Sequence, residues 1–270
     1  MILITGAKGF IGSHLCREFP QAVGIVDDLR DARVLAPYIN KTDVLVHLAS
    51  KVGVETWVKH ADEAYRNNRC VNTNVINFLK ACERKPFVLF TSTSEVYGAT
   101  VNAKETDTFS IVNSPRGLYA LDKIQMEYEL RFTGAPFCIT RLFNIAGGGQ
   151  SPQKGVIPKF IKEITESCPS KVSPDIRSFM SVNDCIMALR HIITHRIQGI
   201  YNIGALNVLN MEDLYALICD ALNRKRNYTC TGHGAIPVRI PNIDKMSRFY
   251  KPESNITEIL DEAIKFFADH

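Results

Sequence analysis

Tyr119 and Lys123 lie four positions apart in a segment whose pattern predicts a helix over residues 118–132. Residues with this spacing share one face of a helix, so we expect the lysine ammonium to depress the pKa of the phenol. A phenol tuned toward neutral pH can act as a general acid or base on a substrate hydroxyl. The same spacing occurs by chance in many chains, so the surrounding residues decide whether it carries chemistry.

A run of hydroxyl and carboxylate side chains follows the strand that is predicted over residues 87–91. The run contains Thr93, Ser94 and Glu95. Ligands of open α/β sheets bind beyond the carboxyl ends of the strands. We therefore expect these three side chains to face the same ligand as Tyr119, although local capping of a strand end uses the same residue types.

A glycine-rich turn connects the first predicted strand, residues 2–5, to the first predicted helix, residues 10–18. Its glycines are Gly6, Gly9 and Gly12. In such a turn the first glycine allows the tight bend, the second lets a pyrophosphate approach the backbone, and the third lets helix and strand pack closely. The free N–H groups and positive dipole end of the helix then attract the anion. The turn predicts a dinucleotide site.

The elements that must position these residues alternate between strand and helix in the first half of the chain. Such alternation predicts a parallel sheet with helices on both faces, a Rossmann-type doubly wound α/β fold. The expected strands cover residues 2–5, 22–26, 44–48, 87–91 and 137–142, and the expected helices cover 10–18, 32–39, 61–83 and 118–132.

The character of the chain changes after the glycines at positions 147–149. Helices predominate there, so we divide the chain into a dinucleotide-binding domain, residues 1–145, and a smaller, mainly helical substrate-binding part, residues 146–270. Segments of the two parts interleave in many such folds. The expected helices of the second part cover 157–165, 183–194, 211–222 and 256–267, with a short strand at 200–203.

Composition narrows the class of protein. The 270 residues are 46% apolar and 22% charged with a net charge of +4, which excludes a disordered chain. The charge is not clustered and no apolar run is long enough to span a bilayer, so we expect neither a nucleic acid nor a membrane as partner. We find no signal peptide and no C-x-x-C pair among the eight cysteines, so we expect a cytoplasmic protein with reduced thiols and no metal site.

Taken in order, several motifs resemble the extended short-chain dehydrogenase/reductases that act on nucleotide-sugars. That family includes enzymes like UDP-glucose 4-epimerase, the 4,6-dehydratases and the uronic acid decarboxylases. The shared order is more specific than any single motif, and the resemblance covers nearly the whole chain. The matching segments are residues 5–12, 47–49, 93–98, 119–123, 141–144, 155–158, 177–179 and 182–184.

The resemblance implies a catalytic role for four residues. Tyr119 would be the acid/base at the carbon 4 hydroxyl, Lys123 would tune it and bind the nicotinamide ribose, and Thr93 would hydrogen-bond the same sugar oxygen. Hydride transfer from carbon 4 gives a 4-keto sugar, and its return to the opposite face is epimerisation. Glu95 occupies a position where similar dehydratases and decarboxylases carry an acid, and it could take the carbon 5 proton.

The resemblance also implies which residues bind the cofactor and the nucleotide-diphosphate sugar. Ser94 and Thr93 would contact the sugar, Asn144 would hold a diphosphate oxygen, and Arg177 would grip the diphosphate with its bidentate fork. The expected cofactor-binding residues are Gly6, Gly9, Phe10, Ile11, Gly12, Asp27, Asp28, Leu29, Leu48, Ala49, Tyr119, Lys123 and Phe143.

The chain departs from the family pattern before His47. About one strand–helix unit is missing there, because a single strand, 22–26, stands where the family has two. If it is the second strand of the sheet, Asp27 should bind the adenosine ribose and favour NAD. If it is the third, Asp28 should contact the adenine. Lys8 could meet the 2′-phosphate of NADP, so we expect NAD and keep NADP as the alternative.

A second departure concerns the later arginine of the family. It is absent from residues 231–237, and Arg239 is the possible substitute. The function predicted first is a nucleotide-sugar epimerase that works as a homodimer through helices near 61–83 and 118–132. The alternatives are a 4,6-dehydratase, a decarboxylase, a 4-keto reductase or a non-catalytic dinucleotide-binding protein.

Overall fold

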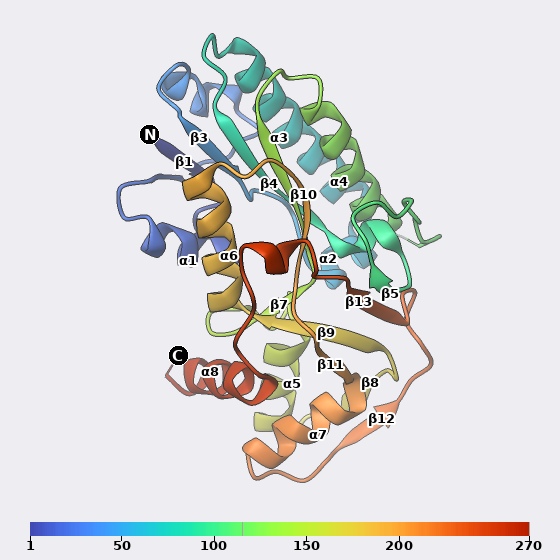
Figure 1. The fold of residues 1–270 in the computed structure, drawn as a ribbon. Coiled ribbons are helices and arrows are strands. Elements are labelled where there is room, and N and C mark those ends of the chain that lie inside the picture. The colour runs from blue at the N-terminus through green and yellow to red at the C-terminus, as the bar shows by residue number, and fades with distance from the viewer. Residues whose placement is uncertain (115, 270) are drawn as a thin grey trace.

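The computed structural model describes residues 1–114 and 116–269. They form a larger and a smaller part, here called layers, each built from a sheet and the helices packed on it (Figure 1). The larger layer is a six-stranded sheet in the order β10-β6-β4-β3-β1-β2, and all of its pairings are parallel. This sheet confirms the predicted doubly wound fold. Its strands are β1 (Ile2–Thr5), β2 (Val23–Ile25), β3 (Val44–His47), β4 (Phe87–Thr93), β6 (Phe137–Leu142) and β10 (Gly199–Ile203).

Helices cover both faces of this sheet (Figure 1). Alternate strand residues point to opposite faces, so Leu3 packs toward α3 (Ala61–Ala81) and α4 (Gly117–Leu130), whereas Ile4 packs toward α1 (Phe10–Glu18) and α6 (Val182–His195). The strands are buried on both faces, which explains why they are nearly continuous apolar runs. A short helix, α2 (Val54–Lys59), was not expected from the sequence.

The smaller layer contains more strand than the sequence suggested. A five-stranded sheet runs β11-β9-β13-β5, with β7 paired to β9 as well. Helices α5 (Val156–Thr165), α7 (Met211–Ala221) and α8 (Ile256–Ala268) form the apolar core of this layer. The additional strands are β5 (Thr100–Ala103), β7 (Asn144–Ala146), β8 (Ser170–Val172), β9 (Ile176–Ser181), β11 (Asn207–Asn210), β12 (Tyr228–Cys230) and β13 (Val238–Pro241).

The layers exchange segments along the chain. Strand β10 and helix α6 follow residue 145 and join the larger layer, whereas β5 precedes it and joins the smaller sheet. The link between β6 and β7, residue 143, therefore lies where the two layers meet. No helix in the described part of the chain is long and apolar enough to cross a membrane.

One expected helix is wrong. Residues 32–39 form two short 3₁₀ turns, Ala32–Val34 and Ala36–Tyr38. Pro37 lacks the N–H that an α-helix interior needs, and the Asp31 side chain caps the first turn by accepting from the Arg33 N–H at 3.0 Å. The chain therefore has no full helix between β2 and β3.

Candidate active site

The polar run after β4 is buried at the carboxyl end of the large sheet. Thr93 is the last residue of β4, and its Oγ1 accepts from the backbone N–H of Glu95 at 3.2 Å. That bond caps a 3₁₀ turn, Ser94–Tyr97, which turns the chain sharply at the sheet edge. The side chains of Thr93, Ser94 and Glu95 are each at least 90% buried, with 7%, 2% and 7% exposure.

Helix α4 brings Tyr119 and Lys123 to the same place. The Thr93 side chain lies next to the phenol of Tyr119, close enough to lower the pKa of that phenol. The ammonium of Lys123 lies 5.8 Å from the Tyr119 ring and donates to the Thr91 carbonyl at 3.0 Å. The ring of Trp57, from α2, packs 5.2 Å from the Tyr119 ring. The structure thus brings a phenol, a hydroxyl and an ammonium together, with the ring of Trp57 packed against the phenol.

The electrostatics of this group differ from the expectation that the lysine depresses the phenol pKa. Burial raises the pKa of Tyr119 above its ordinary value, and the charges of Glu95 and Asp122 add to the rise. The neighbouring Thr93 side chain opposes this rise. Burial also lowers the pKa of Lys123 to about 8, with Asp122 opposing that fall. In the protein alone, desolvation outweighs the lysine charge, so a further positive charge beside the phenol is needed to favour its anion.

Glu95 is held by two arginines. Its Oε1 forms an ion pair with Arg116 and lies 3.4 Å from an Arg239 guanidinium nitrogen. Its Oε2 is buried and has no hydrogen-bond partner among the described residues. Arg116 was missed from the sequence, although it precedes Tyr119 by three positions and Lys123 by seven, a helical spacing that could have revealed it.

Arg239 also contacts Asn144 and lies near Arg177, the residue that is expected to bind the diphosphate. A guanidinium nitrogen of Arg239 donates to Asn144 Oδ1 at 2.9 Å. Burial and the neighbouring Arg239 charge lower the pKa of Arg177 to about 10, while Asp175 at 3.1 Å opposes the fall. The possible substitute for the family arginine thus lies beside Asn144 and near Arg177. Arg116 and Arg239 contact Glu95, and Arg177 is close enough to interact with it electrostatically.

The glycine turn has the shape of a pyrophosphate cradle. A Cβ on Gly6, at φ +70°, would lie 2.8 Å from the Ala49 nitrogen, and a Cβ on Gly12 would lie 2.1 Å from the Gly6 carbonyl oxygen. Gly9 is the N-cap of α1, where no side chain caps the first N–H groups and the first turn has no acid. Those N–H groups, which include the ones of Phe10 and Ile11, suit an anion. The turn therefore fits the pyrophosphate of a dinucleotide.

The strand order decides which role Asp27 can have. β2 pairs directly with β1, so it holds the place of the second strand in a doubly wound sheet. Asp27 follows it and is exposed. Asp28 is occupied by an ion pair with Arg30, which lowers the pKa of Asp28 to about 2. Leu29 is buried in the core with 4% exposure, so its side chain packs away from solvent.

The remaining expected cofactor residues surround this cradle or the catalytic turn. The N–H groups of Leu48 and Ala49 donate to Thr5 Oγ1 at 3.1 and 3.2 Å, at the end of β1. Phe143 has 4% exposure and stacks on Tyr97 at 6.3 Å between ring centroids. Phe143 thus lines the turn that carries Glu95 and is buried there.

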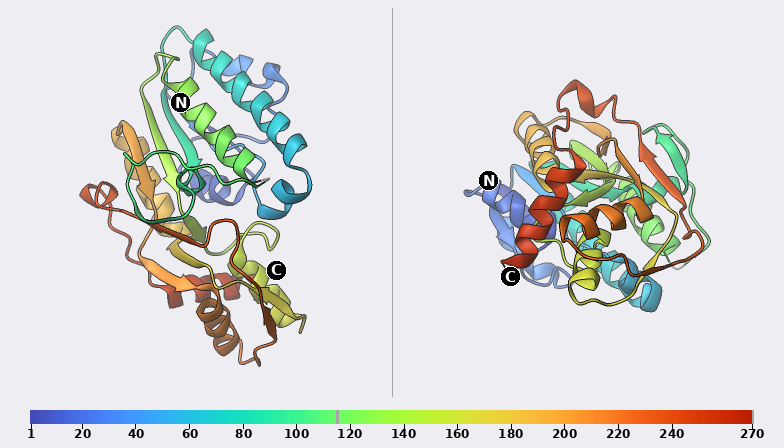
Figure 2. Two further views of the ribbon diagram at one scale, coloured as in Figure 1. Left: turned by 90° about the vertical axis from the view of Figure 1, so that its right-hand side faces the viewer. Right: turned by 90° about the horizontal axis from the view of Figure 1, so that it is seen from below.

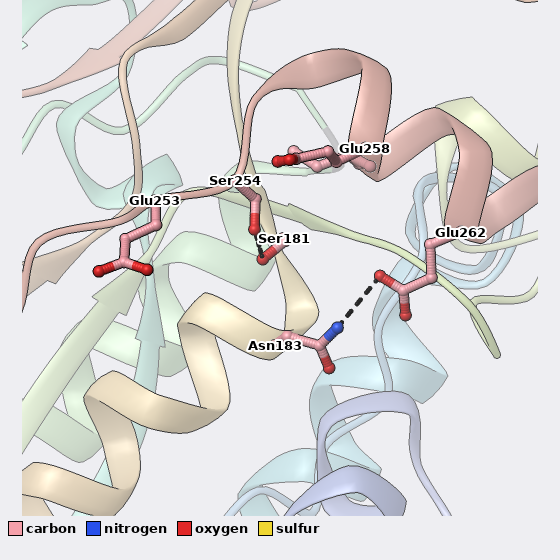
Figure 3. A pocket seen from close by; sticks show the side chains of 7 residues that line it. Ser181, Asn183, Glu253, Ser254, Glu258 and Glu262 are labelled. Carbon is pink, nitrogen blue, oxygen red and sulfur yellow. Dashed lines mark hydrogen bonds between the residues drawn. The ribbon is translucent and has the colours of Figure 1, made fainter.

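A separate pocket of about 420 Å³ lies between the starts of α6 and α8 (Figure 3). It is lined by Glu253, Glu258 and Glu262 together with small polar side chains such as Ser181. None of the site residues expected from the sequence line it. Its acidic lining would repel a diphosphate.

The comparisons with known proteins agree with this fold. The model of the NAD dependent epimerase/dehydratase family matches residues 2–204. The chain belongs to this family. The NAD dependent epimerase/dehydratase family consists of enzymes, so the expected resemblance and the expected NAD cofactor are confirmed at the family level.

Similar members of the family differ in their reactions. A UDP-N-acetyl-alpha-D-glucosaminuronate decarboxylase of Bacillus cytotoxicus is 28% identical over 99% of this chain and 97% of its own length. The crystal structure of a UDP-glucuronic acid 4-epimerase from Bacillus cereus, with UDP-glucuronic acid and NAD, has a TM-score of 0.89 at 23% identity and 99% coverage of both chains. A dTDP-glucose 4,6-dehydratase from Streptomyces venezuelae has a TM-score of 0.90 at 21% identity, covering 100% of this chain and 97% of that one. These structures share the fold, and the reaction has to be argued from the site.

Proposed function

We propose that the chain is a nucleotide-sugar 4-epimerase that uses NAD and passes through a 4-keto sugar. The observation that carries the proposal is the contact of Thr93, Tyr119 and Lys123 at the carboxyl end of β4. The glycine cradle lies at the end of β1, within the same sheet edge. Such a trio suits removal of a proton from a sugar hydroxyl, because the Thr93 hydroxyl and the Tyr119 phenol can both hydrogen-bond the same sugar oxygen.

Each residue of the trio has one task in the proposed reaction. Tyr119 takes the proton of the carbon 4 hydroxyl, and Thr93 holds the oxygen through its own hydroxyl. Lys123 supplies positive charge under the phenol and a donor for a ribose hydroxyl. Bound NAD supplies a reversible hydride acceptor. Returning hydride to the opposite face of carbon 4, with the proton from Tyr119, inverts that carbon without net oxidation.

The arginines suit the diphosphate of the substrate. Arg239 presents a guanidinium group whose fork matches phosphate oxygens, and it donates to Asn144 Oδ1. The guanidinium of Arg177 donates to Asp175 and to the backbone carbonyls of residues 176, 236 and 237, so it would exchange some of these bonds for phosphate oxygens. On the cofactor side, Asp27 follows the second strand and can accept hydrogen bonds from both ribose hydroxyls. A 2′-phosphate would meet the Asp27 carboxylate, so this position favours NAD over NADP.

A panel of UDP-, GDP-, CDP- and dTDP-sugars with NAD or NADP tests the proposal by mass spectrometry and chromatography of the products. An epimerase gives a product of unchanged mass and consumes no net cofactor. Tyr119→Phe should abolish turnover but keep NAD binding. Tyr128→Phe on the same helix, where the side chain is 51% exposed, is the matched control and should be fully active. Near-normal activity of Tyr119→Phe would contradict the assigned role of the phenol.

Glu95 favours a second candidate, a 4,6-dehydratase or a decarboxylase. Its Oε2 has no hydrogen-bond partner among the described residues and lies next to the trio, so it could take a proton from carbon 5 of a 4-keto sugar as hydroxide leaves carbon 6. In a decarboxylase, carbon dioxide leaves by cleavage of the bond between carbons 5 and 6, and carbon 5 then gains a proton without a base having removed one. Loss of water or carbon dioxide lowers the product mass, so the same panel separates these reactions. Glu95→Gln should abolish dehydration and leave epimerisation measurable. A 4-keto reductase would instead consume reduced cofactor in proportion to product.

We also infer a homodimer through α3 and α4. These helices lie side by side on one outer face (Figure 2). Helix α4 exposes Leu121 and Tyr128, and Phe132 is exposed just past the end of the helix. Their exposed fractions are 38%, 51% and 80%. Such a stripe is typical of a buried contact. Sedimentation velocity should give a dimer that Phe132→Asp weakens, and a monomeric wild-type protein would contradict this assembly.

A further inference from the structure

A buried chain of hydrogen bonds links the catalytic helix to the glycine turn. Asp122, next to Lys123, accepts from Asn72 Nδ2 at 2.9 Å. Asn72 Oδ1 faces His47 Nε2 at 3.0 Å, and His47 Nδ1 lies 2.8 Å from Thr5 Oγ1. Thr5 immediately precedes Gly6. All four side chains of this relay, Thr5, His47, Asn72 and Asp122, have 2% exposure or less.

The direction of each hydrogen bond is fixed from the Thr5 end. Thr5 Oγ1 already accepts the N–H groups of Leu48 and Ala49. A hydroxyl has two acceptor positions and one hydrogen, so Thr5 must donate its hydrogen to His47 Nδ1. Neutral His47 then carries its proton on Nε2 and donates it to Asn72 Oδ1. Burial keeps the imidazole neutral, since it lowers the pKa of His47 to about 4.

The other end of the relay requires the same direction. Asp122 accepts two amide bonds, because Asn68 Nδ2 also donates to it at 3.2 Å. The orientation of Asn68 is set by the backbone, since the Lys51 N–H donates to Asn68 Oδ1 at 2.7 Å. Burial raises the pKa of Asp122, and the charges of the neighbouring Lys123 and of Arg69, with a nitrogen at 3.7 Å, oppose that rise. Both carboxyl oxygens receive an amide N–H, which fits the ionised form. A carboxylate accepts only, so Asn72 must turn its NH₂ toward Asp122 and its oxygen toward His47.

We propose that Asp122 is a positioning residue that fixes the tautomer of His47 through Asn72 and thereby holds the Thr5 hydroxyl and the glycine turn in their NAD-binding arrangement. Asp122 does not touch the reacting atoms. It couples the helix that carries Tyr119 to the turn that holds the dinucleotide. The control of the His47 tautomer is argued from the hydrogen bonds of the protein alone, whereas the effect on NAD binding rests on the proposed function.

The count of hydrogen-bond donors and acceptors predicts that Asp122→Asn reverses the direction of the hydrogen bonds along the relay. Asn68 cannot turn, so the new amide must give its oxygen to Asn68 and its NH₂ to Asn72. Asn72 then flips and presents its NH₂ to His47 Nε2, which must become an acceptor. The imidazole proton moves to Nδ1 and points at Thr5 Oγ1, which already accepts two N–H groups and has its own hydrogen to place.

Nitrogen-15 NMR of labelled histidine reads the His47 tautomer directly, with His47→Gln assigning the signal. The wild type should carry the proton on Nε2. Asp122→Asn should move it to Nδ1 and weaken NAD about tenfold in calorimetry, the cost of one lost neutral hydrogen bond. Asp220→Asn, which removes an exposed carboxylate on α7, should change neither reading.

The exchange Asp122→Asn with Asn72→Asp is the decisive variant. Its carboxylate at position 72 accepts from both His47 Nε2 and the new amide, so the Nε2 tautomer and NAD affinity should return. Wild-type tautomer in Asp122→Asn, or a shifted tautomer with unchanged NAD affinity, would overturn the proposal. If the single variant does not fold, the exchange variant decides, and a proton on its Nδ1 would refute the relay. None of these readings needs turnover, so they stay valid if the reaction is not epimerisation.

Discussion

His47 makes the stability of this protein depend on pH in a way that the structure lets us work out. The imidazole is 1% exposed and stacks on Phe90 at 5.7 Å between ring centroids. Burial lowers its pKa from 6.5 to about 4. The folded protein therefore resists a proton that the unfolded chain accepts. Stability from neutral His47 is fully present above pH 6.5 and is lost as pH falls from 6.5 to 4.

The expected magnitude follows from the two pKa values. Linkage gives a loss of about 2 kcal/mol in the free energy of unfolding between pH 7 and pH 5, and about 3 kcal/mol by pH 4. Other groups titrate in the same range, so the quantity of interest is a difference between two proteins. His47→Gln removes the titration and leaves those other groups in place. The variant starts less stable at pH 7 because it loses packing on Phe90.

Urea unfolding of both proteins at several pH values between 4.5 and 7.5 measures the effect. The wild type should lose stability more steeply toward acid than His47→Gln, and the two curves should converge. Exchanging the exposed His60 for Gln provides a control whose curve should run parallel to that of the wild type. Parallel curves for the wild type and His47→Gln would refute both the buried neutral imidazole and the relay direction that depends on it.

Three further predictions test the cofactor site and the trio. The pKa of Lys123 is lowered to about 8, so kcat/KM should fall as pH rises through 8 and Lys123→Arg, which stays charged, should lose that alkaline limb in a pH–rate profile. Gly12→Ala places a Cβ 2.1 Å from the Gly6 oxygen and should cost about 1–3 kcal/mol in thermal unfolding, more than Gly9→Ala at 3.1 Å. Asp27→Asn should reduce the ratio of NAD to NADP affinity by about tenfold in calorimetry, about 1.4 kcal/mol, and an unchanged ratio would remove Asp27 from the ribose site.

Apolar runs made the large sheet predictable. Residues 2–5 and 137–142 coincide with β1 and β6, because buried parallel strands consist of continuous apolar residues. The strands of the smaller sheet could not be found in that way. Strand β9, Ile176–Ser181, mixes Arg177 and serines with apolar residues, and β11, Asn207–Asn210, is short and half-exposed. Their pairing is decided by partners far along the chain.

The local motifs of the site were readable, and its long-range contacts were not. Thr93 and Tyr119 could be placed because each lies in a short pattern with its own chemistry. Trp57 and Arg239 reach the site from a short helix and from the other layer, so no spacing in the sequence connects them to Tyr119. Asp122 could be seen beside Lys123, but its role depends on amides of α3 that only folding brings near.

The short segment before His47 removes an edge strand of the sheet and keeps Asp27 after the second strand. Strand β2 stays paired with β1, so Asp27 occupies the place of the second strand, and the strand that is absent from the described sheet is the one beyond it. A helix would normally cover the adjacent apolar face. Here Leu29 and Leu35, with 4% and 2% exposure, insert from the loop and the 3₁₀ turns into the core formed by Leu3 and α3. The loop thus supplies the packing of the missing unit with fewer residues. β2 has only three residues, which limits pairing with other chains at the open edge.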